Sequence, residues 1–201
     1  CANLKMSFVT GGLFLNESIE VARMHNPGEA WDETIRRALE HGVSSLPKAA
    51  SRRRTLREIV NRISTLGEEE LSFLVEEADR QDQQALLWLA TCRAYRFVRE
   101  FAEEVIHERF LSFKLDLPLE TFDVLFEAKA EWDEGLNGIS ATTRAKLRQV
   151  LFRMMREANV ITPESRILAA YVSPQLAAML ARNCPSDLDL FPGLSVNGGA
   201  L

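Results

Sequence analysis

Thirty consecutive residues in the middle of the chain, from Asp82 to Leu111, contain neither glycine nor proline. Apolar side chains recur through this segment, as in "ALLWLATC" and "FVREFAEEVI". Because glycine and proline are the residues that most often interrupt a helix, their absence favours one long helix. The segment therefore predicts a central helix within a mostly helical chain of 201 residues.

The segments on either side also show helical patterns. Apolar residues at spacings of three and four occur in Phe14–His25, in Ala30–Gly42 and from about Arg53 to Leu66. Residues 160–172, "VITPESRILAAYV", hold two short apolar runs around Pro-Glu-Ser and could form a small β-hairpin. We expect an all-α fold in two helical parts, residues 1–74 and 75–201, each containing a helix-turn-helix or winged-helix-like element.

The amino-acid sequence also indicates the cellular compartment of the protein. No apolar run approaches the roughly 18–20 residues that a membrane-spanning helix needs. No basic start followed by an apolar stretch and a small-residue cleavage site indicates a secretory signal. The three cysteines Cys1, Cys92 and Cys184 are far apart and lack CxxC spacing, which fits a reducing compartment. We therefore expect a cytoplasmic protein that does not associate with a membrane.

The positive charge of this acidic chain is concentrated in two short stretches. Overall, 24 lysines and arginines stand against 29 acids, which gives a net charge of −5. The stretches 48–64 and 139–161 together hold 11 of those cations and only 2 acids, so the other 161 residues hold 13 cations and 27 acids. Charge sorted in this way indicates a surface for a polyanion.

If each basic stretch is a helix, in which successive residues are rotated by about 100°, it has one apolar face and one basic face. The later helix is expected from Thr143 to about Asn159, with Ser140 or Thr142 as its N-cap. The apolar faces consist of Leu56, Ile59, Val60 and Ile63 in the first helix and of Leu147, Leu151, Met154 and Ala158 in the second. Exposed arginine, lysine, asparagine and glutamine suit phosphate oxygens and base edges. The predicted DNA-binding residues are Arg52, Arg53, Arg54, Arg57, Asn61, Arg144, Lys146, Gln149, Arg153 and Arg156.

The order of elements around the later basic helix resembles a winged helix-turn-helix. A helix ends near Gly135, a turn rich in glycine and asparagine follows, and the basic helix precedes the expected hairpin. The alternative is that long arginine side chains simply solvate exposed helix faces. Two separate basic helices in an acidic chain favour binding of nucleic acid or of another polyanion.

The sequence offers no catalytic constellation, so we expect neither an enzyme nor a bound metal or cofactor. His25, His41 and His107 are isolated, and no P-loop, GxGxxG or GxSxG sequence occurs. Asp116 followed by Glu127-Ala128-Lys129 imitates the Asp…Glu-x-Lys pattern of some nucleases. That chemistry needs the Glu and Lys on a strand, where alternate residues face the same way, and the stretch has a helical pattern. Three tryptophans among apolar neighbours are interpreted as core residues, namely Trp31, Trp88 and Trp132.

Several longer phrases carry a resemblance to a known family. These are "SFVTGGLFLNES", "RTLREIVNRISTL", "ALLWLATCRAYRFVREFAEEVIHERFLS", "FEAKAEWDE" and "TTRAKLRQVLFRMMREANVI". In this order, from about Ser7 to Leu180, they resemble the BrxA family of bacterial BREX phage-exclusion systems. Only the tail after Asn183 lies outside the similarity.

The resemblance implies a cytoplasmic, mostly helical, non-enzymatic component of a phage-defence system that acts beside a methyltransferase, a phosphatase-like protein and ATPases. It also implies helix-turn-helix elements and double-stranded DNA as a partner. Two alternatives stay open. The basic faces could dock acidic BREX subunits in a protein–protein adaptor, or the chain could bind RNA, since the family has been likened to the antitermination protein NusB.

Overall fold

A computed structural model of the chain describes residues 4–44, 46 and 49–194, and this part contains helices but no strand. The predicted all-α class is therefore confirmed. No helix within these ranges is long and apolar enough to cross a membrane. The α-helices are α1 Leu15–Met24, α2 Trp31–His41, α3 Ala49–Ile63, α4 Glu68–Glu76, α5 Arg80–Ala94, α6 Arg96–Phe101, α7 Glu108–Leu111, α8 Glu120–Ala130, α9 Glu134–Asn137, α10 Ala141–Glu157 and α11 Pro174–Asn183. A π-helix, η1 Ala102–His107, lies between α6 and α7, and a 3₁₀-helix, η2 Pro185–Leu190, follows α11.

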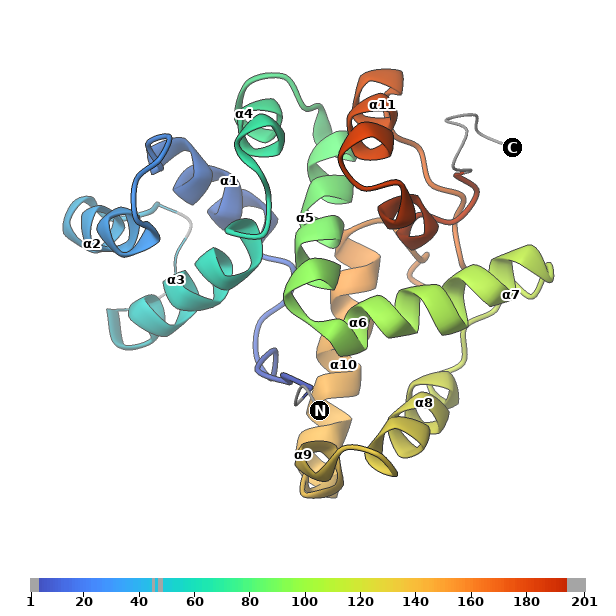
Figure 1. Cartoon of the computed structure of the whole chain (residues 1–201). Coiled ribbons are helices and arrows are strands. Elements are labelled where there is room, and N and C mark those ends of the chain that lie inside the picture. The colour runs from blue at the N-terminus through green and yellow to red at the C-terminus, as the bar shows by residue number, and fades with distance from the viewer. Residues whose placement is uncertain (1–3, 45, 47–48, 195–201) are drawn as a thin grey trace.

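Helix α5 lies in the middle of the molecule, with α1 to α4 on one side and the later helices on the other (Figure 1). One cluster of buried apolar side chains extends across both sides, from Ile59 of α3 through Trp88 of α5 to Leu151 of α10. The two predicted parts, residues 1–74 and 75–201, therefore share a hydrophobic core, and the boundary between them stays a prediction.

The prediction of a single helix from Asp82 to Leu111 is wrong, because the chain bends at Tyr95. This residue has an extended backbone, with φ −123° and ψ 106°, between α5 and α6 (Figure 1). Its side chain is fully buried, its hydroxyl donates to the Glu58 carboxylate, and its ring meets the Phe8 ring edge-on at 4.9 Å. Burial of this aromatic side chain against the first part of the chain outweighs the helical preference of the local sequence.

The expected β-hairpin near 160–172 is reduced to isolated bridges. Ile161 forms a single antiparallel bridge with Ile167, and Asp116 forms one with Arg166. The backbone that follows α7 therefore lies beside the turn that follows α10. The sequence pattern did not indicate this third segment.

The three tryptophans differ in their surroundings. Trp88 is fully buried, and its indole N–H donates to the Leu190 carbonyl at 3.1 Å. Trp31 is half-buried and stacks on His25, with ring centroids 3.6 Å apart. Trp132 is 86% exposed, so its prediction as a core residue is wrong. Helix α8 ends at Ala130, and Trp132 lies in the turn that follows, outside the helix whose apolar face is buried.

Candidate nucleic-acid interface

Helix α3 has the two faces that its sequence predicts. Leu56, Ile59 and Ile63 are completely buried. Three arginines point to solvent and have no hydrogen-bond or ion-pair partner in the part of the chain that the structure describes: Arg53, Arg54 and Arg57. Charges that are neither buried nor neutralised by neighbours remain available to an external polyanion.

Helix α10 repeats the arrangement. The Ser140 hydroxyl accepts a hydrogen bond from the Thr143 N–H at 3.2 Å, and so caps the helix at the first of the two predicted residues. Its apolar face, including Leu147 and Leu151, is buried. Three exposed side chains on this helix likewise lack a partner among residues 4–44, 46 and 49–194: Lys146, Gln149 and Arg156.

Arg144, at the start of α10, is held by the protein itself. Its guanidinium lies 3.1 Å from a carboxylate oxygen of Asp123 and 3.1 Å from one of Glu127, and it covers the Phe126 ring at 4.8 Å. Arg148 pairs with the same Asp123 at 2.7 Å. These contacts fix α10 against α8, so we leave Arg144 out of the candidate surface.

Arg153 is intermediate between the exposed side chains without a partner and the arginines that the protein itself holds. Its side chain is 58% exposed, yet its Nε donates to Glu157 at 3.0 Å and its Nη1 donates to the Gly11 carbonyl at 3.3 Å. An external phosphate would have to compete with both acceptors. We therefore treat Arg153 as a secondary member of the surface.

Two further predicted residues lie partly inside the molecule. Asn61 is half-buried, accepts a hydrogen bond from Lys5 Nζ at 3.0 Å and donates to the Tyr95 hydroxyl at 3.3 Å. Arg52 is half-buried, and its Nε is shielded from solvent without a hydrogen-bond partner among the described residues. Neither is as accessible as the exposed arginines of the same helix, Arg53, Arg54 and Arg57.

Arg62 shows how differently a cation of the first basic stretch can be used. Its side chain is fully buried, donates to the Gly12 carbonyl at 2.7 Å and pairs with Glu58 at 3.2 Å. Burial lowers the pKa of the Arg62 guanidinium, whereas Glu58 opposes that shift. Arginine remains charged at neutral pH, so Arg62 is a structural cation that holds α3 to the segment before α1.

The segment before α1 connects the two basic helices, a feature that sequence patterns missed. At one end the Leu4 N–H donates to Asp133 at 2.9 Å, which lowers the pKa of that carboxyl. At the other end Gly12 lies against α10, where an added Cβ would come within 2.1 Å of a Glu157 carboxylate oxygen. A larger residue here would have to displace the end of the Glu157 side chain, whereas glycine leaves that side chain in place. The one sequence signal in this segment is the Gly-Gly pair at residues 11 and 12, a pattern that by itself indicates a turn and not a contact with a distant helix.

The residues that imitate a nuclease pattern are separated, as their helical spacing predicts. Glu127 and Lys129 both lie on α8, where Glu127 pairs with Arg144 and Lys129 pairs with Glu100 and Glu104. Asp116 pairs with Arg109 at 3.2 Å. Within the described ranges, no three His, Cys, Asp or Glu side chains gather in a way that could hold a metal ion.

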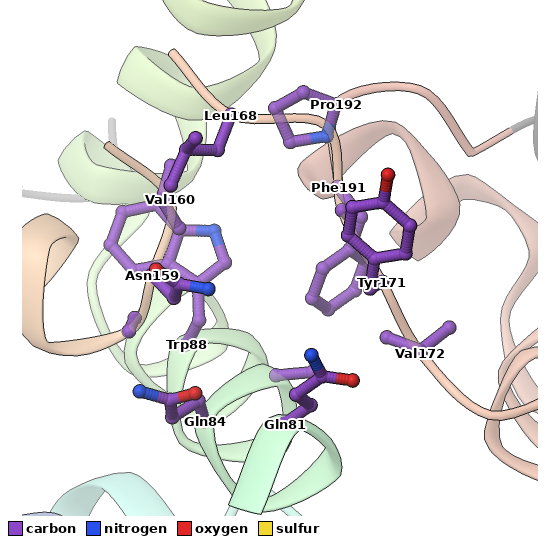
Figure 2. Close-up of a pocket in the computed structure, with 13 residues that line it drawn as sticks. Gln81, Gln84, Trp88, Asn159, Val160, Leu168, Tyr171, Val172, Phe191 and Pro192 are labelled. Atoms are coloured by element: carbon purple, nitrogen blue, oxygen red, sulfur yellow. The ribbon is translucent and has the colours of Figure 1, made fainter. Parts of the chain in front are cut away.

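A small cleft lies between α5 and the chain that follows α10. Figure 2 shows Trp88 and Leu168 on one side of it and Tyr171 and Phe191 on the other, with Gln81 and Gln84 below. Its volume of about 30 Å³ has room for about two water molecules. The cleft is too small for a nucleotide. The unpaired cations make the exposed faces of α3 and α10 the main candidate site for a polyanion.

These features define a helical protein whose two amphipathic helices present unpaired cations on an otherwise acidic chain. The sequence model of the BrxA family matches residues 2–184, and the chain belongs to this family. A curated relative, the BREX protein BrxA of Escherichia coli O9:H4 (strain HS), is 27% identical over 183 residues, which cover 89% of this chain and 84% of that protein.

A solved structure supports the fold. The crystal structure of an uncharacterized protein from Magnetospirillum magneticum matches 97% of this chain and 100% of its own chain, with a TM-score of 0.78. At 22% sequence identity this similarity shows a shared fold and carries no functional information.

Proposed function

We propose that this protein is a non-enzymatic, cytoplasmic component of a BREX phage-defence system that binds duplex DNA through α3 and α10. The observation that carries the proposal is the set of exposed cations on α3 and α10 that have no intramolecular partner among the described residues: Arg53, Arg54, Arg57, Lys146 and Arg156. Other cations of the same stretches, such as Arg62 and Arg148, are satisfied internally. Unsatisfied cations on two helices suit the phosphates of a duplex.

The order of elements around α10 supports a winged-helix-like mode. Helices α6 to α7 precede an extended segment at Asp116, then come α8, α9, α10 and the turn between Ile161 and Ile167. In such units the last helix before the hairpin enters the major groove, and its exposed side chains reach base edges. Lys146 and Gln149 occupy this position on α10 and could read or track the groove.

A titration of labelled duplex DNA at several salt concentrations tests the proposal. Log affinity should fall with log salt at about −0.9 per neutralised phosphate, so two to five contacting cations predict a slope between about −1.8 and about −4.5. Unlabelled RNA serves as the competitor. A chain that binds no bare duplex at low salt would support the adaptor of BREX subunits instead, and preference for single-stranded RNA would support an RNA-binding role.

A further inference from the structure

Phe113, just beyond the end of α7, combines two unfavourable properties. Its side chain is 90% exposed. Its backbone is left-handed, with φ 57°, and closes α7 through hydrogen bonds from the Phe113 N–H to the Phe110 carbonyl at 3.1 Å and from the Lys114 N–H to the Arg109 carbonyl at 2.9 Å. This is the helix ending at which glycine is normally found, because a Cβ strains the left-handed backbone. A bulky aromatic here gains almost no burial against the described residues of its own chain in return.

An apolar groove lies near the same loop, between η1 and α8. Its volume is about 470 Å³, and its apolar wall consists of Val105, Pro118, Val124, Leu125 and Ala128. Val124 is 68% exposed, and Leu119 at the start of α8 is 47% exposed. Arg109 lines the groove and also donates to the Asp116 carbonyl at 2.8 Å, so the groove and the loop of Phe113 are structurally joined.

The groove between η1 and α8 and the loop of Phe113 carry complementary charges. Two acids line the groove, Glu104 and Glu120. Glu104 pairs with Lys129 at 2.9 Å, whereas Glu120 has no partner in the described part of the chain. Lys114, which directly follows Phe113, is exposed and equally unpaired there. The groove thus suits an apolar side chain accompanied by a cation, and the Phe113-Lys114 pair is such a group.

We propose that the partner of this groove is a second copy of the chain. In a two-fold symmetric dimer, Phe113 of each copy inserts into the groove of the other, and Lys114 of each copy faces Glu120 of the other. An isologous contact of this kind makes every interaction twice. The end of α7 lies on the side of the molecule away from α3 (Figure 1), so the contact leaves α3 accessible.

The proposed contact is small. Leu111, Phe113, Leu119 and Val124 are its large exposed apolar side chains, fewer than a standard interface of about 20–30 residues a side contains. We therefore expect a reversible dimer with a dissociation constant on the order of 10 µM. Sedimentation equilibrium of the whole chain from about 1 µM to about 500 µM covers this range.

Phe113→Gly is the decisive variant. Glycine suits the left-handed residue at the helix end, so the melting temperature of the dilute monomer should stay the same or rise. Loss of both inserted rings should weaken dimerisation at least a hundredfold. Trp132→Ala is the matched control, since Trp132 is equally exposed but lies at the other end of α8, and it should dimerise normally.

A charge exchange tests the symmetry. Lys114→Glu and Glu120→Lys should each weaken self-association by roughly tenfold, because each variant places like charges opposite one another at both ends of the contact. An equimolar mixture of the two variants should associate like the unmodified chain, since both ends then pair opposite charges. A chain that stays monomeric throughout the concentration range, or a Phe113→Gly variant that dimerises normally, overturns the proposal and leaves the groove to another protein. Failure of the mixture to recover association overturns the two-fold arrangement.

Discussion

Two arginines of α3, Arg57 and Arg62, show how burial decides the role of a cation. Arg62 is fully buried and bound to Glu58 and to the Gly12 carbonyl, whereas Arg57 is exposed and lacks a partner in the described part of the chain. The sequence shows both as members of one basic stretch. Helical position alone does not separate them, since each lies about 60° from the edge of the buried apolar stripe of α3. Arg62 is buried because the segment before α1 covers its side of the helix, where the Gly12 carbonyl accepts its hydrogen bond.

Replacement by glutamine should lower the stability of the fold at Arg62 and weaken DNA binding at Arg57. Arg62→Gln leaves Glu58 and a carbonyl without their cation and should lower the free energy of unfolding by about 3–5 kcal/mol. Arg57→Gln should change it by less than about 0.5 kcal/mol while weakening DNA binding. Urea unfolding followed by circular dichroism measures both free energies. Equal stability of the two variants would show that Arg62 is not the buried structural cation described above.

At the scale of helices, periodicity predicted well where a helix has one buried face. The apolar stripes of α3 and α10 are buried as expected, because a 3.6-residue period directly identifies the face that meets the core. Local composition was a poorer guide: the absence of glycine and proline did not reveal the break at Tyr95, and apolar neighbours did not bury Trp132. Tyr95 breaks the central helix through contacts with residues more than 30 positions away, such as Glu58. Such long-range contacts leave no local signal.

The candidate surface was predictable only in part for the same reason. Exposure of Arg53, Arg54 and Arg57 follows from helical position alone. The engagement of Arg144 depends on Asp123, an acid on another helix that the pattern cannot place beside it. The role of Gly12 between α3 and α10 likewise depends on how distant segments meet.

The cap of α10 can be tested directly, because the sequence offered two candidates and the structure selects one. Ser140→Ala removes the hydroxyl that accepts from the Thr143 N–H and should lower the free energy of unfolding by about 1 kcal/mol. Thr142→Ala is the control, since Thr142 is exposed within the first turn and does not cap the helix, and its effect should stay below about 0.5 kcal/mol. Chemical unfolding of the two variants side by side gives the comparison. A larger loss for Thr142→Ala would mean that α10 begins later.

The molecule as a whole separates its charges by location. Five of the exposed cations that lack a partner among the described residues lie on α3 and α10, and the segment before α1 binds both helices through Gly12 and its neighbours. The groove beside α8 has acids along its rim and an unsatisfied apolar wall. One polyanion-binding side and one self-associating side would allow two copies to engage DNA together, which raises the effective concentration of each basic helix at its site.

The most direct test of DNA binding by α3 and α10 is the salt dependence of duplex affinity for three paired variants. Lys146→Gln with Arg156→Gln, and Arg54→Gln with Arg57→Gln, should each make the slope of log affinity against log salt shallower by about 2. Arg36→Gln with Arg96→Gln is the matched control, because these exposed arginines already pair with acids on their own helices, and its slope should not change. If the first two variants keep normal melting and the unmodified slope, the cations of α3 and α10 do not contact DNA and the central claim is contradicted.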